Sequence, residues 1–434
     1  MLHRTQCAAA LVAIPADRLL QGLLAWALCC SWQPSLTLAA TASPVTAGPV
    51  AAGPVTAGPL TAGPAPADPS SGAAPATPGA AHTIGAGRTQ NVVLIVSDGL
   101  RWQEMFTGAD ASLLKPDTGG NWLSEKELRQ RYWRPDPTER RQLLFPFIWS
   151  TVARHGQIFG NRTRGSDAHV TNGLAFSYPG YNEMSVGYPD KRINSNEFGP
   201  NPNASVFEWL NNLPELHGQV AIYGTWSTFT DIFNEPRSHL VIQAGWKTPP
   251  PTGDASRDAL LARLLATTTR FDEEDLDGAL LQVELLDYVR AHNPRVLFVG
   301  YGETDGWAHQ GRYDLVLASA QRMDAFVREL WETMQSIPQY RERTTFIITA
   351  DHGRGSGLVQ WKEHGVKQPG SENVWIAVIG PDTPPLGERT QTEPVTQSQI
   401  AATVAAFVGK DYRQSVPAAA PAIRAVLGAD PRHD

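Results

Sequence analysis

The sequence contains few cysteines, and none of them lies where a folded domain is expected. Only three occur among 434 residues, all near the start: Cys7, Cys29 and Cys30. A domain without cysteine has no disulfide and no thiolate metal ligand, so a metal site there must use carboxylates and imidazoles. An excess of positive charge is also absent, because the formal net charge is −7. This balance argues against nucleic-acid binding, which needs clustered Lys and Arg.

The sequence also lacks a hydrophobic run of comfortable membrane-spanning length. The apolar stretch from Leu19 to Trp32 is shorter than the roughly 20 residues that a transmembrane helix needs. Arg4 and Arg18 precede this stretch, and Ala40-Thr41-Ala42 offers a small-residue cleavage site. These features predict a secretory signal over residues 1–42, hence an exported (periplasmic or secreted) protein with no transmembrane span once mature. An N-terminal anchor that is never cut is the alternative.

Composition predicts two further regions along the chain. Residues 43–88 are rich in Ala, Pro, Gly and Thr, with near-repeats such as Pro44-Val-Thr-Ala-Gly. This segment has few large apolar groups to bury, so we expect a disordered linker. The remaining residues, 89–434, are expected to form the folded domain. A Pro- and Gly-rich stretch from Ala244 to Asp254 indicates a surface loop, which fits a cap inserted over about 199–290.

Apolar runs and amphipathic patterns alternate through the expected domain. Runs typical of buried strands occur at 91–97, 219–223, 295–301, 345–350 and 374–379. Helical patterns occur at 204–212, 257–265, 276–290, 314–331 and 398–408. In the pattern from 314 to 331, we expect Arg322, Asp324 and Arg328 to face mostly outward. The alternation predicts an α/β sandwich of three layers, with a mostly parallel central sheet and helices on both faces.

Carboxylates and histidines follow the predicted strands. Ligands gather at the carboxyl ends of parallel strands, and six side chains fall at or near such ends: Asp98, Asp305, His309, Asp351, His352 and His364. Each alone has an ordinary interpretation, since Asp-Gly is a common turn and a D-x-x-x-H spacing is common by chance. Together they predict a site for two divalent metal ions, with zinc as the first choice and manganese as the alternative.

A nucleophile for such a site is expected on a tight loop or at a helix start. Ser177 fits, because it precedes a Pro179-Gly180 turn that leads into a predicted helix. An ordinary turn serine is the competing interpretation. Thr171 and Ser185 are rivals, but Ser185 falls about two turns into the helix and Thr171 lacks the downstream pattern.

At this point the sequence resembles the alkaline phosphatase superfamily, and most nearly its nucleotide pyrophosphatase/phosphodiesterase branch. That branch has an aspartate after the first strand and a nucleophile in a T-F-P-N-H-like turn that runs on to T-G-x-x-P-E/D. Here Ser177-Tyr-Pro-Gly-Tyr runs on to Ser185-Val-Gly-Tyr-Pro-Asp190. A D-x-x-x-H pair, a D-H-G strand end, a final histidine and a closing helix follow in the family's order. The resemblance covers residues from about 91 to 409.

The resemblance implies an alkaline-phosphatase-like fold and a division of the ligands between two ions. One ion would be held by Asp305, His309 and His364. The other would be held by Asp98, Asp351 and His352, with the Ser177 hydroxyl bridging toward it. The family's phosphodiesterases also use an asparagine after the nucleophile loop to hold a phosphoryl oxygen. Asn196 is our choice for this role, with Asn194 as the alternative.

Three departures from the branch leave the ester class open. Thr is the usual nucleophile among the diesterases, whereas Ser is usual in monoesterases and mutases. Tyr181 stands where a sulfatase would carry Arg, so sulfatase chemistry is disfavoured. The short spacing between His352 and His364 resembles the arrangement in phosphopentomutase and phosphoglycerate mutase.

The leading hypothesis from sequence is an exported two-metal hydrolase of small-molecule phosphate esters, a phosphatase or phosphodiesterase with a phosphoseryl intermediate. A phosphomutase of the same fold is an alternative that export weakens, because sugar-phosphate metabolism is intracellular. A catalytically inactive, metal-stabilised surface or binding protein is a second alternative, against which the complete ligand set argues. Neither the natural substrate nor the oligomeric state follows from the sequence.

Overall fold

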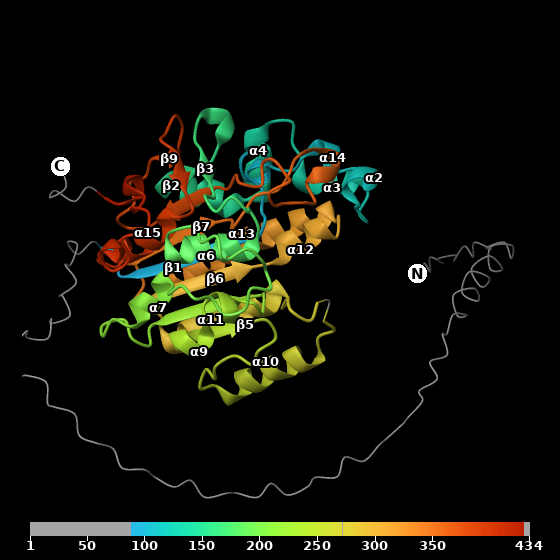
Figure 1. Cartoon of the computed structure of the whole chain (residues 1–434). Coiled ribbons are helices and arrows are strands. Elements are labelled where there is room, and N and C mark those ends of the chain that lie inside the picture. The colour runs from blue at the N-terminus through green and yellow to red at the C-terminus, as the bar shows by residue number, and fades with distance from the viewer. Residues whose placement is uncertain (1–87, 271, 429–434) are drawn as a thin grey trace, which may run out of the picture. The chain divides into compact units, whose positions relative to one another are not determined.

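The computed structural model describes residues 88–270 and 272–428 (Figure 1). The predicted secretory signal and residues 43–87 of the predicted linker lie outside the described residues. The strands are β1 Asn91–Ser97, β2 Gly156–Phe159, β3 Ala168–His169, β4 Val220–Gly224, β5 Val241–Ala244, β6 Val296–Tyr301, β7 Thr344–Thr349, β8 Ile376–Ile379, β9 Gly387–Glu388 and β10 Val395–Thr396. The α-helices are α1 Trp102–Thr107, α2 Pro116–Gly119, α3 Glu125–Tyr132, α4 Pro137–Leu144, α5 Ala153–His155, α6 Ser177–Val186, α7 Val206–Asn211, α8 Phe229–Ile232, α9 Glu235–Ser238, α10 Ala255–Thr267, α11 Gly278–His292, α12 Glu303–His309, α13 Tyr313–Ser336, α14 Gly357–Gln360 and α15 Gln399–Phe407.

Eight of the strands form one sheet in the order β5-β4-β6-β1-β7-β8-β2-β9. All neighbouring pairs from β5 to β7 are parallel, and β8 alone runs antiparallel to both of its neighbours. The mostly parallel sheet predicted from the sequence is therefore confirmed. The predicted strand over 374–379 begins later, at Ile376, and its direction is reversed. His364 consequently lies in a loop before an antiparallel strand, not beyond the carboxyl end of a parallel one.

The centre of the sheet brings the predicted ligands to one edge. Strand β1 is buried at every position, as its unbroken apolar run predicts for a strand covered on both faces. It pairs in parallel with β6 and β7, with Ser97 opposite Tyr301 and Val96 opposite Thr349. All three strands therefore end at the same level, and the residues that follow each of them share one edge of the sheet.

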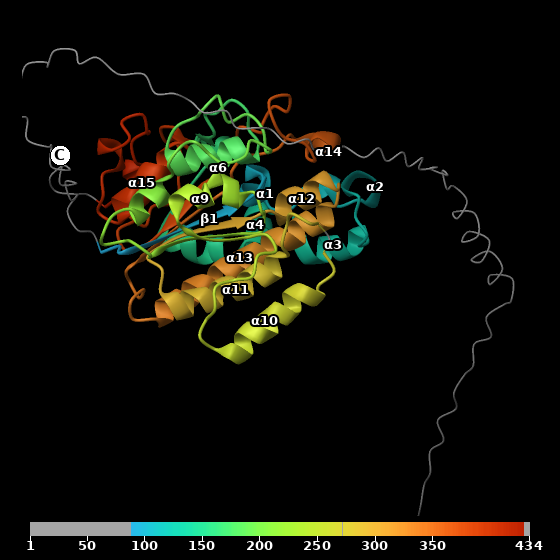
Figure 2. The same ribbon diagram turned by 60° about the horizontal axis from the view of Figure 1, so that its bottom comes forward.

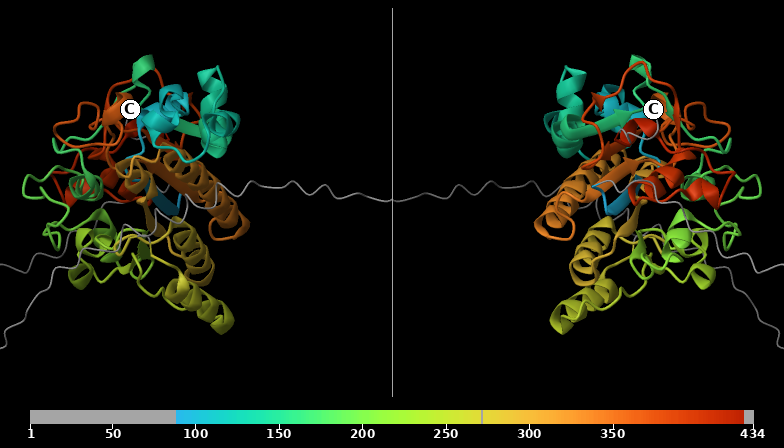
Figure 3. Two further views of the ribbon diagram at one scale, coloured as in Figure 1. Left: turned by 90° about the vertical axis from the view of Figure 1, so that its right-hand side faces the viewer. Right: turned by 90° about the vertical axis from the view of Figure 1, so that its left-hand side faces the viewer.

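Helices cover both faces of the sheet, as the sequence predicts (Figure 2). Helices α11 and α13 run side by side on one face (Figure 3), where Phe326 of α13 packs edge-on against Tyr301 of β6. Helices α6 and α7 lie on the opposite face, and their Tyr181 and Phe207 pack against Phe298 of β6. The fold class predicted from the sequence is confirmed. None of the described helices combines the length and apolar character needed to cross a membrane.

Two sequence expectations need correction. Asp324 of α13 does not face outward: it is buried, and its carboxylate accepts hydrogen bonds from the backbone N–H groups of Phe147 (2.8 Å) and Ile148 (2.9 Å). Burial raises the pKa of Asp324 to about 6. The range 199–290, considered as an inserted cap, supplies β4 and β5 to the central sheet. Those strands belong to the main domain and not to a separate cap.

Candidate metal centre

Three of the predicted ligands form a buried group, which we call the inner set: Asp98, Asp351 and His352. Asp98 follows β1, and Asp351 and His352 follow β7. One oxygen of each carboxylate is occupied, because Asp98 Oδ2 accepts from the Tyr181 hydroxyl (3.0 Å) and Asp351 Oδ1 accepts from the Gly99 N–H (3.0 Å). The other oxygens, Asp98 Oδ1 and Asp351 Oδ2, are buried without a hydrogen-bond partner.

These two unpartnered oxygens face the same nitrogen. His352 Nε2 lies 3.2 Å from Asp98 Oδ1 and 3.4 Å from Asp351 Oδ2. The other ring nitrogen, Nδ1, lies 2.8 Å from the Gly353 carbonyl oxygen, which accepts only from an N–H. This contact assigns the proton to Nδ1 and leaves the Nε2 lone pair facing the carboxylates. Two unpartnered carboxylate oxygens thus converge with a ring nitrogen whose described side-chain hydrogen-bond partner is the Ser177 hydroxyl (3.4 Å), and this arrangement suits a divalent cation.

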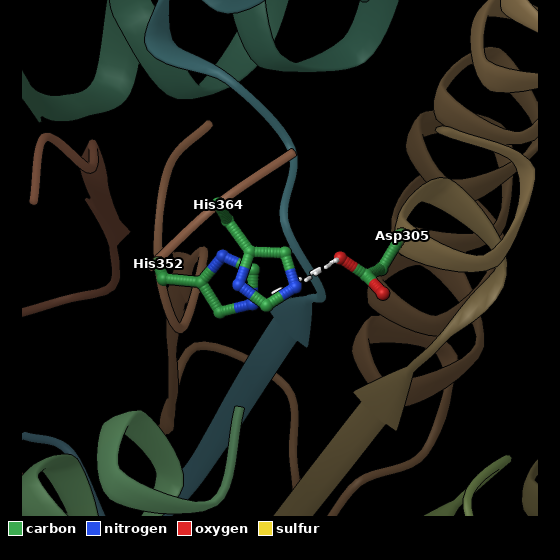
Figure 4. A group of neighbouring side chains, drawn as sticks. All are labelled: Asp305, His352 and His364. Atoms are coloured by element: carbon green, nitrogen blue, oxygen red, sulfur yellow. Dashed lines mark ion pairs between the residues drawn. The ribbon is translucent and has the colours of Figure 1, made fainter. Parts of the chain in front are cut away.

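The remaining three ligands form a more open group, the outer set: Asp305, His309 and His364. Asp305 and His309 lie on α12, and His364 lies in the loop before β8. His309 Nε2 is 3.2 Å from Asp305 Oδ2 and 2.9 Å from His364 Nε2, and His364 Nε2 is 3.7 Å from Asp305 Oδ1. The two sets adjoin, because the His352 and His364 rings stack 4.1 Å apart and His352 Nε2 lies 3.9 Å from Asp305 Oδ1 (Figure 4).

Charge is distributed unevenly between the two sets. Burial raises the pKa of Asp98 well above its usual value, and the nearby Asp305 carboxylate raises it further. Burial, followed by the Asp98 charge, does the same to Asp351. Burial acts on Asp305 in the raising direction, but the Arg354 guanidinium together with His309 and His352 outweighs it and holds the pKa of Asp305 well below its usual value. The inner carboxylates therefore need a proton or a cation for neutrality, whereas Asp305 already has a cationic partner.

Arg354 connects the outer set to a loop. Its side chain is 2% exposed, pairs with Asp305 through Nη1, and donates to the carbonyl oxygens of Trp361 (3.1 Å) and Lys362 through Nε and Nη2. Arg354 follows His352 by two residues, and Lys362 precedes His364 by two. One buried side chain thus fixes both ends of the loop that joins the two histidines.

Ser177 lies beside the inner set, at the first residue of α6. Its hydroxyl oxygen is 3.4 Å from His352 Nε2. Asn196 lies next to it in space, because Asn196 Oδ1 accepts the backbone N–H of Tyr178 (3.0 Å). Asn194 is exposed. Of the two rivals for Ser177, Thr171 bonds to Glu183 (2.8 Å) and Ser185 bonds to the Asn182 carbonyl oxygen (3.1 Å).

Close packing at this edge depends on two glycines. A Cβ atom at Gly180 would lie 2.5 Å from the Asp351 carbonyl oxygen, so a glycine lets the start of α6 approach the end of β7. Gly99 has a φ of +59°, and a Cβ atom there would lie 2.7 Å from both Arg354 Nη1 and Asp305 Oδ1. A larger residue at either position would displace the candidate ligands or Ser177.

Three residues of the site were not predicted from the sequence: Tyr181, Glu183 and Arg354. Tyr181 was considered only as a departure from sulfatases, yet it donates to Asp98. A signal for Arg354 was present, since it immediately follows the Asp351-His352-Gly353 strand end. A cationic residue so close to two candidate metal ligands is itself a candidate ion-pair partner for a third ligand, here Asp305. The role of Glu183, described below, depends on contacts that no local pattern indicates.

Comparisons with known proteins agree with this fold. Residues 271–411 match the model of the Metalloenzyme superfamily. The fold is that of the alkaline-phosphatase-like metalloenzymes. The structure of wild-type alkaline phosphatase PafA is similar with a TM-score of 0.51 at 10% identity, covering 79% of this chain and 100% of that chain. The matched segment contains the whole outer set together with Asp351 and His352.

Two other solved structures are more distantly similar. Phosphonate monoester hydrolase SpPMH from Silicibacter pomeroyi has a TM-score of 0.49 at 11% identity, covering 80% of this chain and 78% of that chain. BT1596, a 2-O GAG sulfatase, has a TM-score of 0.44 at 14% identity, covering 79% and 74%. No curated protein matches the sequence significantly. The predicted alkaline-phosphatase-like fold is thus confirmed, and the nucleotide pyrophosphatase/phosphodiesterase branch stays a prediction. Two groups of ligand atoms lie close enough together to indicate divalent metal binding: the inner set, and Asp305 and His364 of the outer set together with His352.

Proposed function

We propose that this protein hydrolyses phosphate esters with Ser177 as the nucleophile and two divalent metal ions, zinc by preference. The observation that carries the proposal is the position of Ser177 Oγ, 3.4 Å from His352 Nε2 and beside the unpartnered oxygens of the inner set. The inner and outer sets supply three nitrogen or oxygen ligands each, which suits zinc. When bound, such ions lower the pKa of a hydroxyl or water and stabilise charge on phosphoryl and leaving oxygens.

The residues of the chain suit the two half-reactions. Ser177 Oγ would attack phosphorus while the bond to the leaving oxygen breaks, giving phosphoserine and an alcohol that takes up the serine's proton. Water would then hydrolyse the phosphoserine, releasing phosphate and restoring the hydroxyl. The N-terminus of α6 favours negative charge at Ser177. Asn196 uses its Oδ1 to accept the Tyr178 N–H, so its amide nitrogen is the donor for a nonbridging phosphoryl oxygen.

Activity screening tests this proposal. The purified protein is assayed with nitrophenyl phosphate, bis-nitrophenyl phosphate and nitrophenyl sulfate, before and after chelation and with zinc or manganese restored. We expect metal-dependent release of nitrophenol from a phosphate ester and little from the sulfate. Ser177→Ala should remove activity by at least about 10³-fold while metal content and folding stay unchanged. Normal turnover by Ser177→Ala, or a loss in Thr171→Ala or Ser185→Ala alone, would overturn the assignment.

We also propose that the protein is exported, as the features of residues 1–42 predict. Export would place the enzyme where it meets phosphate esters outside the cytoplasm. Fractionation of producing cells, with mass spectrometry of the native N-terminus, tests this proposal. We expect cleavage near Ala42, and an intact Met1 in the cytoplasmic fraction would contradict it.

A further inference from the structure

A buried carboxylate lies two turns beyond Ser177 on the same helix. Glu183 of α6 is fully buried and accepts hydrogen bonds from both the backbone and the side chain of two residues, Thr171 and Asn172. These four contacts measure 2.8–2.9 Å, and the Ser398 hydroxyl adds a fifth at 2.7 Å. The carboxylate is therefore held by five donors, all from the segment before Ser177 or from the segment before α15.

The segment between these donors and Ser177 forms an arch. Asn172 continues the contact, because its Oδ1 accepts the backbone N–H groups of Leu174 (2.8 Å) and Ala175 (2.9 Å). Ala175 has a φ of +50°, a left-handed conformation that residues with a side chain rarely adopt. The chain then extends through Phe176 and enters α6 at Ser177. The arch, residues 171–176, is thus fastened to α6 at both ends, by Glu183 and by the peptide bond to Ser177.

The same region is fastened to the inner set. Gln397 precedes Ser398 and donates from Nε2 to the carbonyl oxygens of Asp351 (2.7 Å) and Ala350 (3.2 Å). A pair of adjacent residues therefore links the carboxylate of Glu183 to the backbone that carries a metal ligand. The arch, the start of α6 and the end of β7 form one hydrogen-bonded frame around Ser177 Oγ.

We propose that Glu183 is a positioning residue, which sets the conformation of the arch and thereby the placement of Ser177 Oγ relative to the inner set. This inference rests on the proposed function. A carboxylate is needed because it has acceptor sites on both oxygens and no donor. A glutamine would direct an NH₂ group toward the N–H groups of Thr171 and Asn172, and at least one contact would be lost. A displacement of the nucleophile by about 1 Å costs on the order of 10²-fold in rate.

Glu183→Gln, which preserves shape and removes acceptor capacity, tests the proposal. We expect kcat to fall about 10–100-fold, with KM and bound metal within about twofold of the unaltered protein. Asn172→Ala removes the side chain that donates to Glu183 and accepts from Leu174 and Ala175, and is expected to lower kcat about tenfold, also with little change in KM. The matched control is Glu208→Gln, since Glu208 is a buried carboxylate of α7 whose described side-chain hydrogen bonds and ion pair are with Arg237 and not with the arch. Its kcat should match the unaltered protein.

The outcomes separate this inference from the proposed function. If Ser177→Ala stays active, the proposed function fails and the inference with it. If Ser177→Ala is inactive while folded Glu183→Gln keeps a normal kcat, only the positioning role is wrong. If Glu183→Gln does not fold, Asn172→Ala decides, and a normal kcat in that variant overturns the proposal. A parallel loss of kcat in Glu208→Gln would also overturn it, because general destabilisation would then explain the effect.

Discussion

The inner and outer sets contain the same kinds of ligand, but the protein holds them differently. The inner side chains are almost inaccessible, with Asp98 at 7% and both Asp351 and His352 at 0% exposure. In the outer set His309 is 39% exposed, Asp305 17% and His364 13%. The inner ligands follow central strands directly, whereas the outer ligands lie on a short helix and at the end of a loop. A cation at the inner set would therefore be held by residues attached to the central sheet, and one at the outer set by residues of a short helix and a loop.

The difference in charge points the same way. The inner carboxylates have unpartnered oxygens and pKa values raised by burial, so they gain most when a cation binds. Asp305 is already paired with Arg354, so a cation there must share its ligand with a guanidinium. We therefore expect the inner set to bind its ion more tightly, and the outer set to bind the ion that is lost first during dialysis.

The largest expected effect separates the two sets by substitution. Asp351→Ala should lose the tightly held ion and lower kcat/KM on the order of 10³-fold, because a buried ligand fixed by a strand has no substitute. His309→Ala should weaken metal binding at the outer set by about 10–100-fold, and activity should recover in excess metal. Metal titration followed by elemental analysis measures both effects. Equal losses, or recovery of Asp351→Ala in excess metal, would contradict the comparison.

A second prediction concerns Arg354. Arg354→Met leaves Asp305 without its cationic partner, and in the metal-free protein the free energy of unfolding should fall by about 3 kcal/mol. The loss should shrink when metal is added, because the ion becomes the new partner of Asp305. Arg257→Met is the control: Arg257 is 43% exposed, and its partner Asp287 keeps a second cation, Arg290, at 3.7 Å, so about 1 kcal/mol is expected. Urea denaturation with and without chelator decides, and equal losses in the two variants would refute the role given to Arg354.

A third prediction uses a buried carboxyl that belongs to neither set. Glu284 of α11 is 1% exposed, Gln243 donates to its Oε2 (3.0 Å), and its Oε1 has no hydrogen-bond partner. Burial raises its pKa to about 8 from the usual 4.5. The folded state therefore retains a proton that the unfolded state loses, so the stability that Glu284 contributes below pH 4.5 is lost as the pH rises toward 8.

Glu284→Gln should remove this pH dependence. The advantage of the variant over the unaltered protein in unfolding free energy should grow by about 4 kcal/mol as the pH rises from about 5 to about 8.5. Denaturation curves at the two pH values, each with chelator and with zinc, measure the gain. Zinc should leave it unchanged, because a single unpartnered oxygen without converging histidines is no metal site. If the gain depended on zinc, Glu284 would itself be binding the metal. Unpartnered oxygens would then not distinguish the inner set from other buried carboxyl groups.

The contrast between the two sets also marks how far the sequence could predict the site. Asp98, Asp351 and His352 were predicted because each follows an apolar run that has to be a buried strand, and the ends of parallel strands meet at one edge. Asp305 and His309 follow another such run by a few residues. His364 was predicted from its position just before the 374–379 strand, and that strand proved to be antiparallel. A local pattern specifies which strand precedes a residue, but not how the strand pairs.

Long-range contacts were beyond the reach of local patterns. The outward placement of Asp324 assumed solvent on that side of α13, and the chain around Phe147 returns to cover it. Arg354 and Glu183 act through carbonyl and N–H groups of distant segments, which periodicity does not reveal. The short strands β2 and β5 were missed because four-residue segments with a glutamine resemble loops. The position of Ser177 at the start of a helix could be predicted more firmly than the contacts made by Glu183 and Arg354, because a turn before a helix is a local feature.

The smallest expected effect tests which part of the loop between His352 and His364 matters. Arg354 fastens the ends of the loop, while its tip exposes Leu358 at 49% and Val359 at 64%. The double variant Leu358→Ser/Val359→Ser should therefore change the free energy of unfolding by no more than about 0.5 kcal/mol. Metal affinity at the outer set should stay within about twofold, because neither side chain contributes to the hydrogen bonds that hold His364. Calorimetric titration of the metal-free protein provides the measurement, with Arg354→Met as the comparison that does weaken the loop. A tenfold loss of affinity in the double variant would mean that the outer set depends on the whole loop, and that the distinction between its fixed ends and its free tip is wrong.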